Sequence, residues 1–422
     1  MSTVSDALIR AHREEWARIV ATLIRVTGDW TLAEDCAQDA FEKAAGRWPS
    51  DGVPSSPGAW LTTVARNAAM DRLRRRATEV RKITEVGVMR ERDGESFAPD
   101  AAELALRPWE EDADDRLRLI FTCAHPALEM PARVALTLRT VAGLSTPEIA
   151  RAFLVPEATM AQRIVRAKRR IAHAGIPYRV PAIDELPGRL DGVLSVLYLV
   201  FSEGYAASSG DDIVRRDLAA EAIRLTRLVL EIVPGDFAGE ARALLALMLL
   251  QDSRRDARTD ASGDLIPLEE QDRAVWDRSA VEEAVLLLRA PAVVHGAYRV
   301  QALLAAEHAT APSAAATDWG RIVELYDELA TFTASPMVQL SRAIAIGFRD
   351  GTAAGLAALD RLDADGSLAG HHLLPAAQAD LLRRSGDETA AAERYRAALD
   401  LAPTAPERRF LLRRLRELGA SG

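Results

Sequence analysis

The sequence predicts an all-α protein, and three observations support that prediction. Alanine, leucine and arginine dominate a chain of 422 residues in which 49% of side chains are hydrophobic and only 5% aromatic, and such residues favour helices. No stretch alternates β-branched and polar residues as a half-buried strand does. Apolar positions recur instead at helical spacing, and the length suits two to four domains.

The first two helices are expected within residues 6–48, with a break near Gly28. The second of them, over 32–48, has an apolar side and an acidic or amide side. The apolar side holds Leu32, Cys36, Ala40, Phe41 and Ala44, and the other side holds Glu34, Asp35, Gln38, Asp39 and Glu42. An acidic face cannot favour phosphate, so it suits a basic protein partner; an ordinary solvated helix face is the alternative.

A proline-, serine- and glycine-rich stretch over 49–57 predicts a loop, and a helix is expected over 59–77. Trp60 and Leu61 belong to its apolar side. Its C-terminal half presents polar and basic side chains, namely Arg66, Asn67, Arg72, Arg74, Arg75 and Arg76. An aromatic residue and a loop ahead of an arginine cluster suit contact with an unpaired nucleic-acid strand. A solvated basic face is again the alternative.

The next segment loses its helical periodicity and gains charge, glycine and proline, which predicts a linker over 81–112. Asp114 and Asp115 are expected to cap a helix that starts at Arg116, and another helix is expected over 131–142. Cys36 and Cys123, the two cysteines, lie in apolar helical patterns and do not form a disulfide framework.

Residues 143–170, GLSTPEIARAFLVPEATMAQRIVRAKRR, predict two short helices joined by a turn at 154–156. Ser145 or Thr146 is expected to cap the first helix. In the second helix the inward residues are expected to be Met160, Ile164 and Val165. The outward residues are Glu157, Thr159, Gln162, Arg163 and Arg166, followed by Lys168, Arg169 and Arg170. A polar start followed by cations is what a DNA major groove accepts; a plain helical hairpin is the alternative.

The remainder of the chain is expected to form a hinge over 176–188, a helical domain over 189–290 with a polar insertion at 252–264, and helical repeats over 291–418. One repeat has the spacing of a tetratricopeptide unit, with Ala379, Leu382, Gly386, Ala391, Tyr395, Ala398 and Pro403. Residues 1–180 hold 27 basic and 25 acidic side chains, a net charge of +2, whereas the remaining residues hold 26 and 37, a net charge of −11.

Enzyme motifs are missing from the sequence, which has no glycine-rich phosphate loop, no HExxH and no GxSxG. We therefore expect neither a catalytic role nor a cofactor or metal. The first residues carry charges where a signal peptide needs an apolar core, and the apolar runs are too short to span a bilayer. A cytoplasmic location is the expectation that follows.

The combination of these segments resembles the extracytoplasmic-function sigma factors of bacterial RNA polymerase. The resemblance covers 1–175 in the family's order and implies sigma domain two at 6–80, the linker at 81–112 and sigma domain four at 113–175. It implies binding to core RNA polymerase, at the clamp coiled coil and the flap region, and to promoter DNA. Polymerase then supplies the chemistry, and no cofactor of this chain is implied.

Three segments carry the implied interfaces. LAEDCAQDAFEKAAGRW looks like the helix that docks on the polymerase clamp, with Glu34, Asp35, Gln38, Asp39 and Phe41 at the docking positions. SSPGAWLTTVARNAAMDRLRRR looks like the segment that melts and reads the −10 element, through Trp60, Asn67, Asp71, Arg72, Arg74 and Arg75. ARVALTLRTVAGLSTPEIARAFLVPEATMAQRIVRAKRRI looks like domain four, which implies −35 contacts by Glu157, Thr159, Gln162, Arg163, Arg166 and Lys168.

The rest of the chain is similar to the subgroup with a long, tetratricopeptide-type helical extension, as in RLDGVLSVLYLVFSEGYAASSG. The resemblance implies that an obvious membrane anti-sigma partner is lacking and that the extension stands in for one. The sequence therefore predicts a sigma factor whose activity its own extension modulates. A stand-alone helix-turn-helix regulator with a helical sensing domain is the alternative from another class. A tetratricopeptide adaptor that binds only protein is a third reading, which leaves the arginine clusters unexplained.

Overall fold

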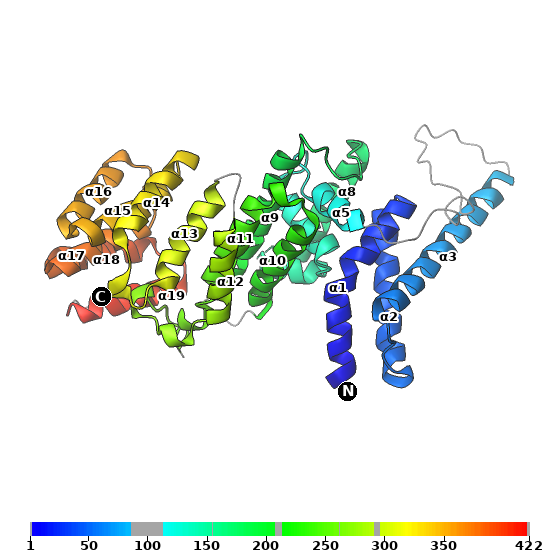
Figure 1. Ribbon diagram of the computed structural model, residues 1–422, viewed down its shortest axis with the longest axis horizontal. Coiled ribbons are helices and arrows are strands. Elements are labelled where there is room, and N and C mark those ends of the chain that lie inside the picture. Colours follow the sequence, from blue (N-terminus) through cyan, green and yellow to red (C-terminus); the bar gives the residue numbers. More distant parts are fainter. Residues whose placement is uncertain are drawn as a thin grey trace. The chain divides into compact units, whose positions relative to one another are not determined.

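The computed structural model describes residues 2–85, 113–153, 155–206, 213–260, 262–290 and 296–419. Within these ranges the regular elements are helices, apart from a single bridge between Thr259 and Leu265, so the all-α prediction is confirmed (Figure 1). The chain forms two compact units. The first contains Met1–Val200 and Glu231–Val233, and the second contains Phe201–Leu230 and Pro234–Gly422.

The first unit begins with three helices that pack against one another, α1 (Ser2–Thr27), α2 (Trp30–Asp51) and α3 (Pro57–Glu85). The break between α1 and α2 lies where the sequence predicts it, because Gly28 adopts a φ of +68° and Asp29 caps α2 by accepting the Leu32 N–H at 2.9 Å. The predicted loop over 49–57 is too long. Helix α2 continues through Pro49 to Asp51. Gly52 caps its C-terminus and donates its N–H to the Trp48 carbonyl at 3.1 Å.

Five helical segments complete most of the first unit: α5 (Ala113–Cys123), α6 (Met130–Leu136), the π-helical turn Thr137–Val141, α7 (Thr146–Ala152) and α8 (Glu157–His173). The expectation that Asp114 and Asp115 cap a helix starting at Arg116 is wrong. Asp115 lies inside α5 and is buried, because it binds Arg25 at 2.8 Å and Arg118 at 2.6 Å. Its role is to join α5 to α1.

Helices α7 and α8 form the predicted helix-turn-helix over 143–170. Ser145 caps α7 in a reciprocal capping box with Glu148. In α8 the buried residues are Met160, Ile164, Ala167 and Ile171. Val165 does not point inward as expected, since 47% of it is exposed; it follows Ile164 by one residue and is rotated onto the solvent side. Leu154 of the predicted turn lies outside the described residues.

The two halves of the first unit pack around α1. Trp16 is buried and donates its indole N–H to the Thr140 carbonyl at 3.1 Å. Gly143, with a φ of +77°, lies so close to α1 that a side-chain carbon there would meet the His12 ring at 2.6 Å. Tyr178 donates to the Ala21 carbonyl at 3.1 Å. The segments expected as separate domains at 6–80 and 113–175 therefore share one core in this structure.

Helix α9 (Leu186–Ala206) contains the division between the two units. Its first part belongs to the first unit, where Arg189 donates to the Phe121 carbonyl at 2.8 Å. Gly192 lies against the Ala124 carbonyl, only 3.4 Å from where its side-chain carbon would be. The units thus divide after Val200, within α9.

The second unit is built from successive helices that pack against their neighbours. After α10 (Ile213–Ile232) these are α11 (Gly239–Asp252), α12 (Arg278–Arg289), α13 (Ala297–Thr310), α14 (Trp319–Phe332), α15 (Pro336–Asp350), α16 (Thr352–Asp365), α17 (Leu373–Ser385), α18 (Glu388–Leu401) and α19 (Ala405–Glu417). Single turns of 3-10 helix lie between them at Gly235–Phe237, Arg255–Ala257, Leu268–Glu270, Arg273–Val275 and Ala314–Ala316.

The repeat expected over 371–403 falls on the helix pair α17 and α18. Gly386 turns the chain between them with a φ of +89°. The small residues Ala379, Ala391 and Ala398 are buried together with Tyr395. The assignment to the tetratricopeptide class stays a prediction. Among the described residues no helix is long and apolar enough to cross a membrane.

Candidate protein and nucleic-acid interfaces

The outward face of α8 is the surface expected to read DNA. Glu157, Thr159, Gln162 and Arg166 are exposed there, as are Arg169 and Arg170, while Arg163 is half-buried. Lys168 differs from the others, because its ammonium group lies 2.9 Å from the Glu34 carboxylate and its side chain is only 16% exposed. This face therefore offers polar and cationic groups to a ligand along its whole length except at Lys168.

Glu34 does not lie on a solvated face as the sequence pattern predicts. Its side chain is only 4% exposed, and the carboxylate accepts from Arg139 at 3.1 Å and from the Thr140 hydroxyl at 3.0 Å, besides pairing with Lys168. A buried carboxylate is tolerated only where donors replace its water. Those donors follow Glu34 by more than a hundred residues, so no local signal could have identified them.

Phe41, expected at a polymerase docking position, is half-buried. Its ring lies 5.0 Å from the His12 ring and 6.0 Å from the Trp16 ring, in the aromatic cluster that also packs against Gly143. In contrast, Asp35 and Gln38 are exposed, and Gln38 donates to Glu42 at 3.1 Å. The expected docking residues thus divide into an exposed group and a group that the first unit covers.

Arg72 connects the acidic face of α2 with the basic face of α3. Its guanidinium lies 2.7 Å from the Asp39 carboxylate and 3.6 Å from that of Asp35. A second pair, Arg76 with Asp29 at 2.9 Å, joins the same helices. Burial alone raises the pKa of Asp29, but the Leu32 N–H and Arg76 stabilise its charge more strongly, so the pKa falls below its usual range. The residues expected to contact polymerase therefore lie next to residues expected to contact DNA.

The remaining residues expected at the −10 strand lie on the outer side of α3. Asn67, Asp71, Arg74 and Arg75 are exposed. Trp60 is half-buried and packs edge-on against the buried Trp48, with ring centroids 5.8 Å apart. The helix thus presents a solvent-facing row of two cations, an amide and the carboxylate of Asp71, which lies 3.7 Å from Arg74. A pair of indoles anchors its first turn.

Neither cysteine of the first unit is placed for reaction. Cys36 and Cys123 are free and buried. Burial, with a smaller contribution from the Glu34 charge, raises the pKa of the Cys123 thiol well above its ordinary value, so the thiol stays protonated and unreactive. Among the described residues no three His, Cys, Asp or Glu side chains gather as a metal site requires.

Comparison with known proteins assigns three parts of the chain to families. Residues 8–79 match Sigma-70 region 2, residues 118–171 match Sigma-70, region 4, and residues 189–292 match a family of unknown function, DUF6596. The chain is 40% identical over 404 residues to an uncharacterized protein of Rhizobium meliloti (strain 1021), a match that covers 95% of this chain and 93% of that protein.

A second relative comes from Mycobacterium tuberculosis (strain H37Rv) and is described as a probable ECF RNA polymerase sigma factor, SigI. It is 27% identical over 171 residues, which cover 40% of this chain and 55% of that protein. No solved structure matches the chain.

Proposed function

Because this chain belongs to the extracytoplasmic-function sigma factors of the sigma-70 family, we propose that it binds core RNA polymerase and directs it to a defined set of promoters in the cytoplasm. One observation carries the proposal most directly. A region 2 with an exposed acidic patch and an exposed arginine row precedes a region 4 whose second helix presents polar and cationic side chains. A stand-alone regulator has no use for the first of these regions.

The acidic patch on α2 is the surface we propose for the polymerase clamp. Asp35, Gln38 and Asp39 remain at the surface and suit a basic coiled-coil partner. Glu34 and Phe41 are covered in this conformation, so they join that interface only when region 4 moves away from region 2. The flap region of polymerase is the partner we propose for region 4.

The promoter contacts we propose are divided between α3 and α8. Asn67, Arg74 and Arg75 on α3 face solvent and can line an unpaired −10 strand, with Trp60 at the start of the helix. On α8, Gln162 and Arg163 are candidates for base edges of the −35 element, and Arg166 suits phosphate. Lys168 becomes available to DNA only after its pair with Glu34 separates.

The packing of the two regions around Glu34 supports a closed state of the free protein, in which polymerase and promoter surfaces are partly occupied. We propose that binding to polymerase favours an open state. The net charge of −11 in residues 181–422, opposite in sign to the arginine rows, favours modulation by the extension. Sigma factors are not enzymes themselves, and polymerase supplies the chemistry.

Reconstitution tests the proposed function. The purified full chain is mixed with core polymerase, the complex is isolated by gel filtration, and transcription is measured on a library of promoter sequences. We expect a stoichiometric complex that starts transcription from a narrow class of −35 and −10 elements. A chain that binds DNA alone and shows no association with core polymerase would contradict the proposal.

A further inference from the structure

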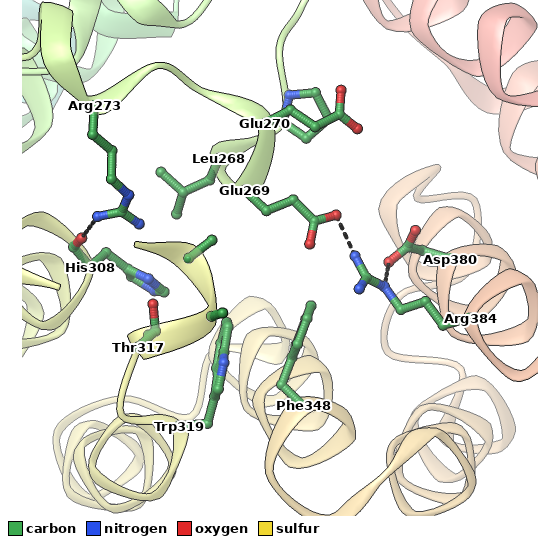
Figure 2. A pocket seen from close by; sticks show the side chains of 13 residues that line it. Leu268, Glu269, Glu270, Arg273, His308, Thr317, Trp319, Phe348, Asp380 and Arg384 are labelled. Carbon is green, nitrogen blue, oxygen red and sulfur yellow. Dashed lines mark hydrogen bonds and ion pairs between the residues drawn. The ribbon is translucent and has the colours of Figure 1, made fainter. Parts of the chain in front are cut away.

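The second unit contains two cavities that are separated by a single segment of chain. One measures about 700 Å³ and the other about 410 Å³. Pro267 and Leu268 line both of them, and each residue from Leu265 to Gln271 lines at least one, so this segment separates the two spaces. We call this segment, together with Asp264 before it (DLIPLEEQ), the strap. Figure 2 shows its 3-10 turn, with Leu268, Glu269 and Glu270, above the larger cavity.

The strap has little regular structure of its own. Leu265 forms an isolated bridge with Thr259, and the Ile266 N–H donates to the Arg258 carbonyl at 2.9 Å. After Pro267 comes only the single turn Leu268–Glu270, and Gln271 then folds back to donate to the Ile266 carbonyl at 3.0 Å. A segment that forms so few bonds with itself is held in place by what surrounds it.

Arginines of two distant helices hold the strap at each of its carboxylates. Glu269 pairs with Arg384 of α17, while Glu270 and Asp264 pair with Arg414 and Arg409 of α19. Arg413 adds a bond to the Leu265 carbonyl at 2.9 Å. Arg384 lines the larger cavity, and Arg409, Arg413 and Arg414 contact the strap beside it. These four arginines together are called the arginine groove below.

The arginines of this groove are oriented by their own helices as well as by the strap. Arg384 also binds Asp380, one turn earlier in α17, at 2.6 Å, and Arg414 binds Glu417 at 2.8 Å. Fixed guanidinium groups are suited to carboxylates because they lose little freedom on binding. The groove is thus prepared for anions and does not depend on the strap for its shape.

Apolar rings line the larger cavity beside the arginines. Trp319 and Phe348 stack with ring centroids 4.2 Å apart, and the Arg384 guanidinium lies 4.7 Å from the Phe348 centroid. Figure 2 shows these two rings side by side below the Glu269–Arg384 pair. An aromatic wall next to a cation accommodates a peptide that combines apolar and acidic side chains.

The fit of the strap to this site is incomplete. The hollows on either side of the strap are partly open to solvent, and the larger one has room for a drug-sized ligand. The carboxylates are partly open to water, with Glu269 37% and Glu270 44% exposed, whereas the Arg414 side chain that pairs with Glu270 is only 8% exposed. The Glu269–Arg384 pair is the more exposed of the two, and exposed ion pairs are individually weak. The site is therefore larger than its occupant, and the occupant is held by replaceable bonds.

We propose that the arginine groove is the binding site for an acidic, leucine-containing peptide of a partner protein, and that the strap is an internal stand-in for that peptide. The partner peptide binds by displacing the strap. Its carboxylates take the places of Asp264, Glu269 and Glu270, and its apolar side chains fill the cavity beside Trp319 and Phe348. This assignment concerns the extension alone and does not depend on the promoter specificity proposed above.

The test uses the full chain and a fluorescein-labelled peptide of residues 262–272, SGDLIPLEEQD. In the released-strap variant, Asp264→Asn, Glu269→Gln and Glu270→Gln are combined. We expect the labelled peptide to bind this variant at least tenfold more tightly than it binds the wild type, as measured by fluorescence anisotropy. Adding Arg384→Gln should remove most of the gain. Glu283→Gln, which breaks an exposed pair with Arg227 elsewhere in the unit, is the matched control and should bind like the wild type.

Three results would overturn the assignment. They are a natively folded released-strap variant that fails to bind the peptide, equal binding of a peptide with Gln and Asn in place of its acids, and equal binding of a single-stranded oligonucleotide of the same charge. Hydrogen exchange of the wild type keeps the proposal testable if the variant misfolds. Excess peptide should then speed exchange in the strap and slow it in α17 and α19, and unchanged rates would contradict displacement.

Discussion

The ammonium group of Lys168 lies 2.9 Å from the buried carboxylate of Glu34, and this pair connects the region expected to dock on polymerase with the helix expected to enter DNA. Arg139 and Thr140 complete the set of donors around Glu34. We propose that Glu34 contacts polymerase and that Lys168 contacts DNA in the open state, whereas Arg139 and Thr140 hold Glu34 in the closed one. Folding of the free chain and promoter recognition therefore compete for the same side chains.

Removing the Glu34 charge should destabilise the first unit. Glu34→Gln leaves two cations, Arg139 and Lys168, without their buried partner, and loss of one member of a buried pair costs about 3–5 kcal/mol. Urea unfolding should report that loss, and hydrogen exchange should rise in the π-helical turn and in α8. Glu42→Gln, an exposed change on the same helix, is the control and should have no such effect. Equal stability of both variants would show that the cluster contributes little.

Reversing the exposed acids of α2 should abolish binding to core polymerase. Asp35→Arg with Asp39→Arg places like charges against a basic partner, which costs several kcal/mol, roughly, at a contact interface. A pull-down with core enzyme measures the loss, and circular dichroism checks the helices. The same double change also removes the partners of Arg72. Arg72→Ala is therefore the matched control, and it should keep core affinity if the carboxylates themselves make the contact.

Base recognition and phosphate binding should separate on α8. Arg163→Ala or Gln162→Ala should cost about 1–3 kcal/mol at one position of the −35 element, whereas Arg166→Ala should weaken all promoters alike. Transcription from a set of single-base −35 variants measures the difference. If Arg163→Ala transcribes every variant in wild-type proportions, another residue of this helix reads the bases.

The stability of the second unit should fall between neutral and mildly acidic pH because of His308. Burial, with smaller contributions from Arg254 and Arg273, lowers the pKa of this imidazole to about 4. The unfolded chain binds the proton from about pH 6.5 downward, whereas the folded chain resists it until about pH 4, so stability is complete above the first value and is lost towards the second. We expect a loss of about 2 kcal/mol between roughly pH 7 and pH 4.5.

Urea titrations at the two pH values measure this loss, with His308→Asn as the test variant and His371→Asn as the control. The test variant should be less stable at neutral pH but should lose less stability on acidification. A wild-type profile that His308→Asn leaves unchanged in shape would assign the pH dependence to other groups.

Truncation should show whether the extension acts on promoter use. Removal of everything after Pro187 would also remove the part of α9 that completes the first unit, including the Arg189–Phe121 bond. Truncation after Val200 keeps that part, so it is the better test. We expect promoter-dependent transcription to change at least tenfold, about 1.4 kcal/mol, with loss if the extension completes the active form and gain if it shields the arginines. Transcription equal to that of the full chain would show that the extension acts on a separate partner and not on promoter use.

Local signals predicted most of the helices correctly. The break at Gly28, the cap at Ser145 and the buried stripe of α8 at Met160 and Ile164 all depend on residues within a few positions of one another. Tertiary contacts account for the error at Asp115. Asp115 is a residue type that often caps helices, but here it is a buried partner of Arg25 and Arg118.

The exposed residues of the candidate interfaces could be predicted from the sequence, whereas the covered residues could not. Asp35, Asn67 and Gln162 are at the surface as the pattern predicts, whereas Glu34 follows the same amphipathic pattern and is buried by donors that lie more than a hundred residues later in the chain. Of the strap, only Asp264 lies in the polar insertion predicted at 252–264. The sequence gives no sign of the ion pairs that hold the strap, because its partners Arg384 and Arg414 lie in helices more than a hundred residues later. Spacing along the chain carries no information about such pairs.

Helix α9 has a consequence for how this protein can be recombined. Its early residues, such as Leu190 and Leu194, are buried within the first unit, while Phe201 and Tyr205 belong to the second unit. Because residues of this one helix belong to both units, no position within it is a simple junction for exchanging one unit. Chimaeras that carry a foreign second unit are therefore expected to fold only when α9 matches the host at its start and the donor at its end.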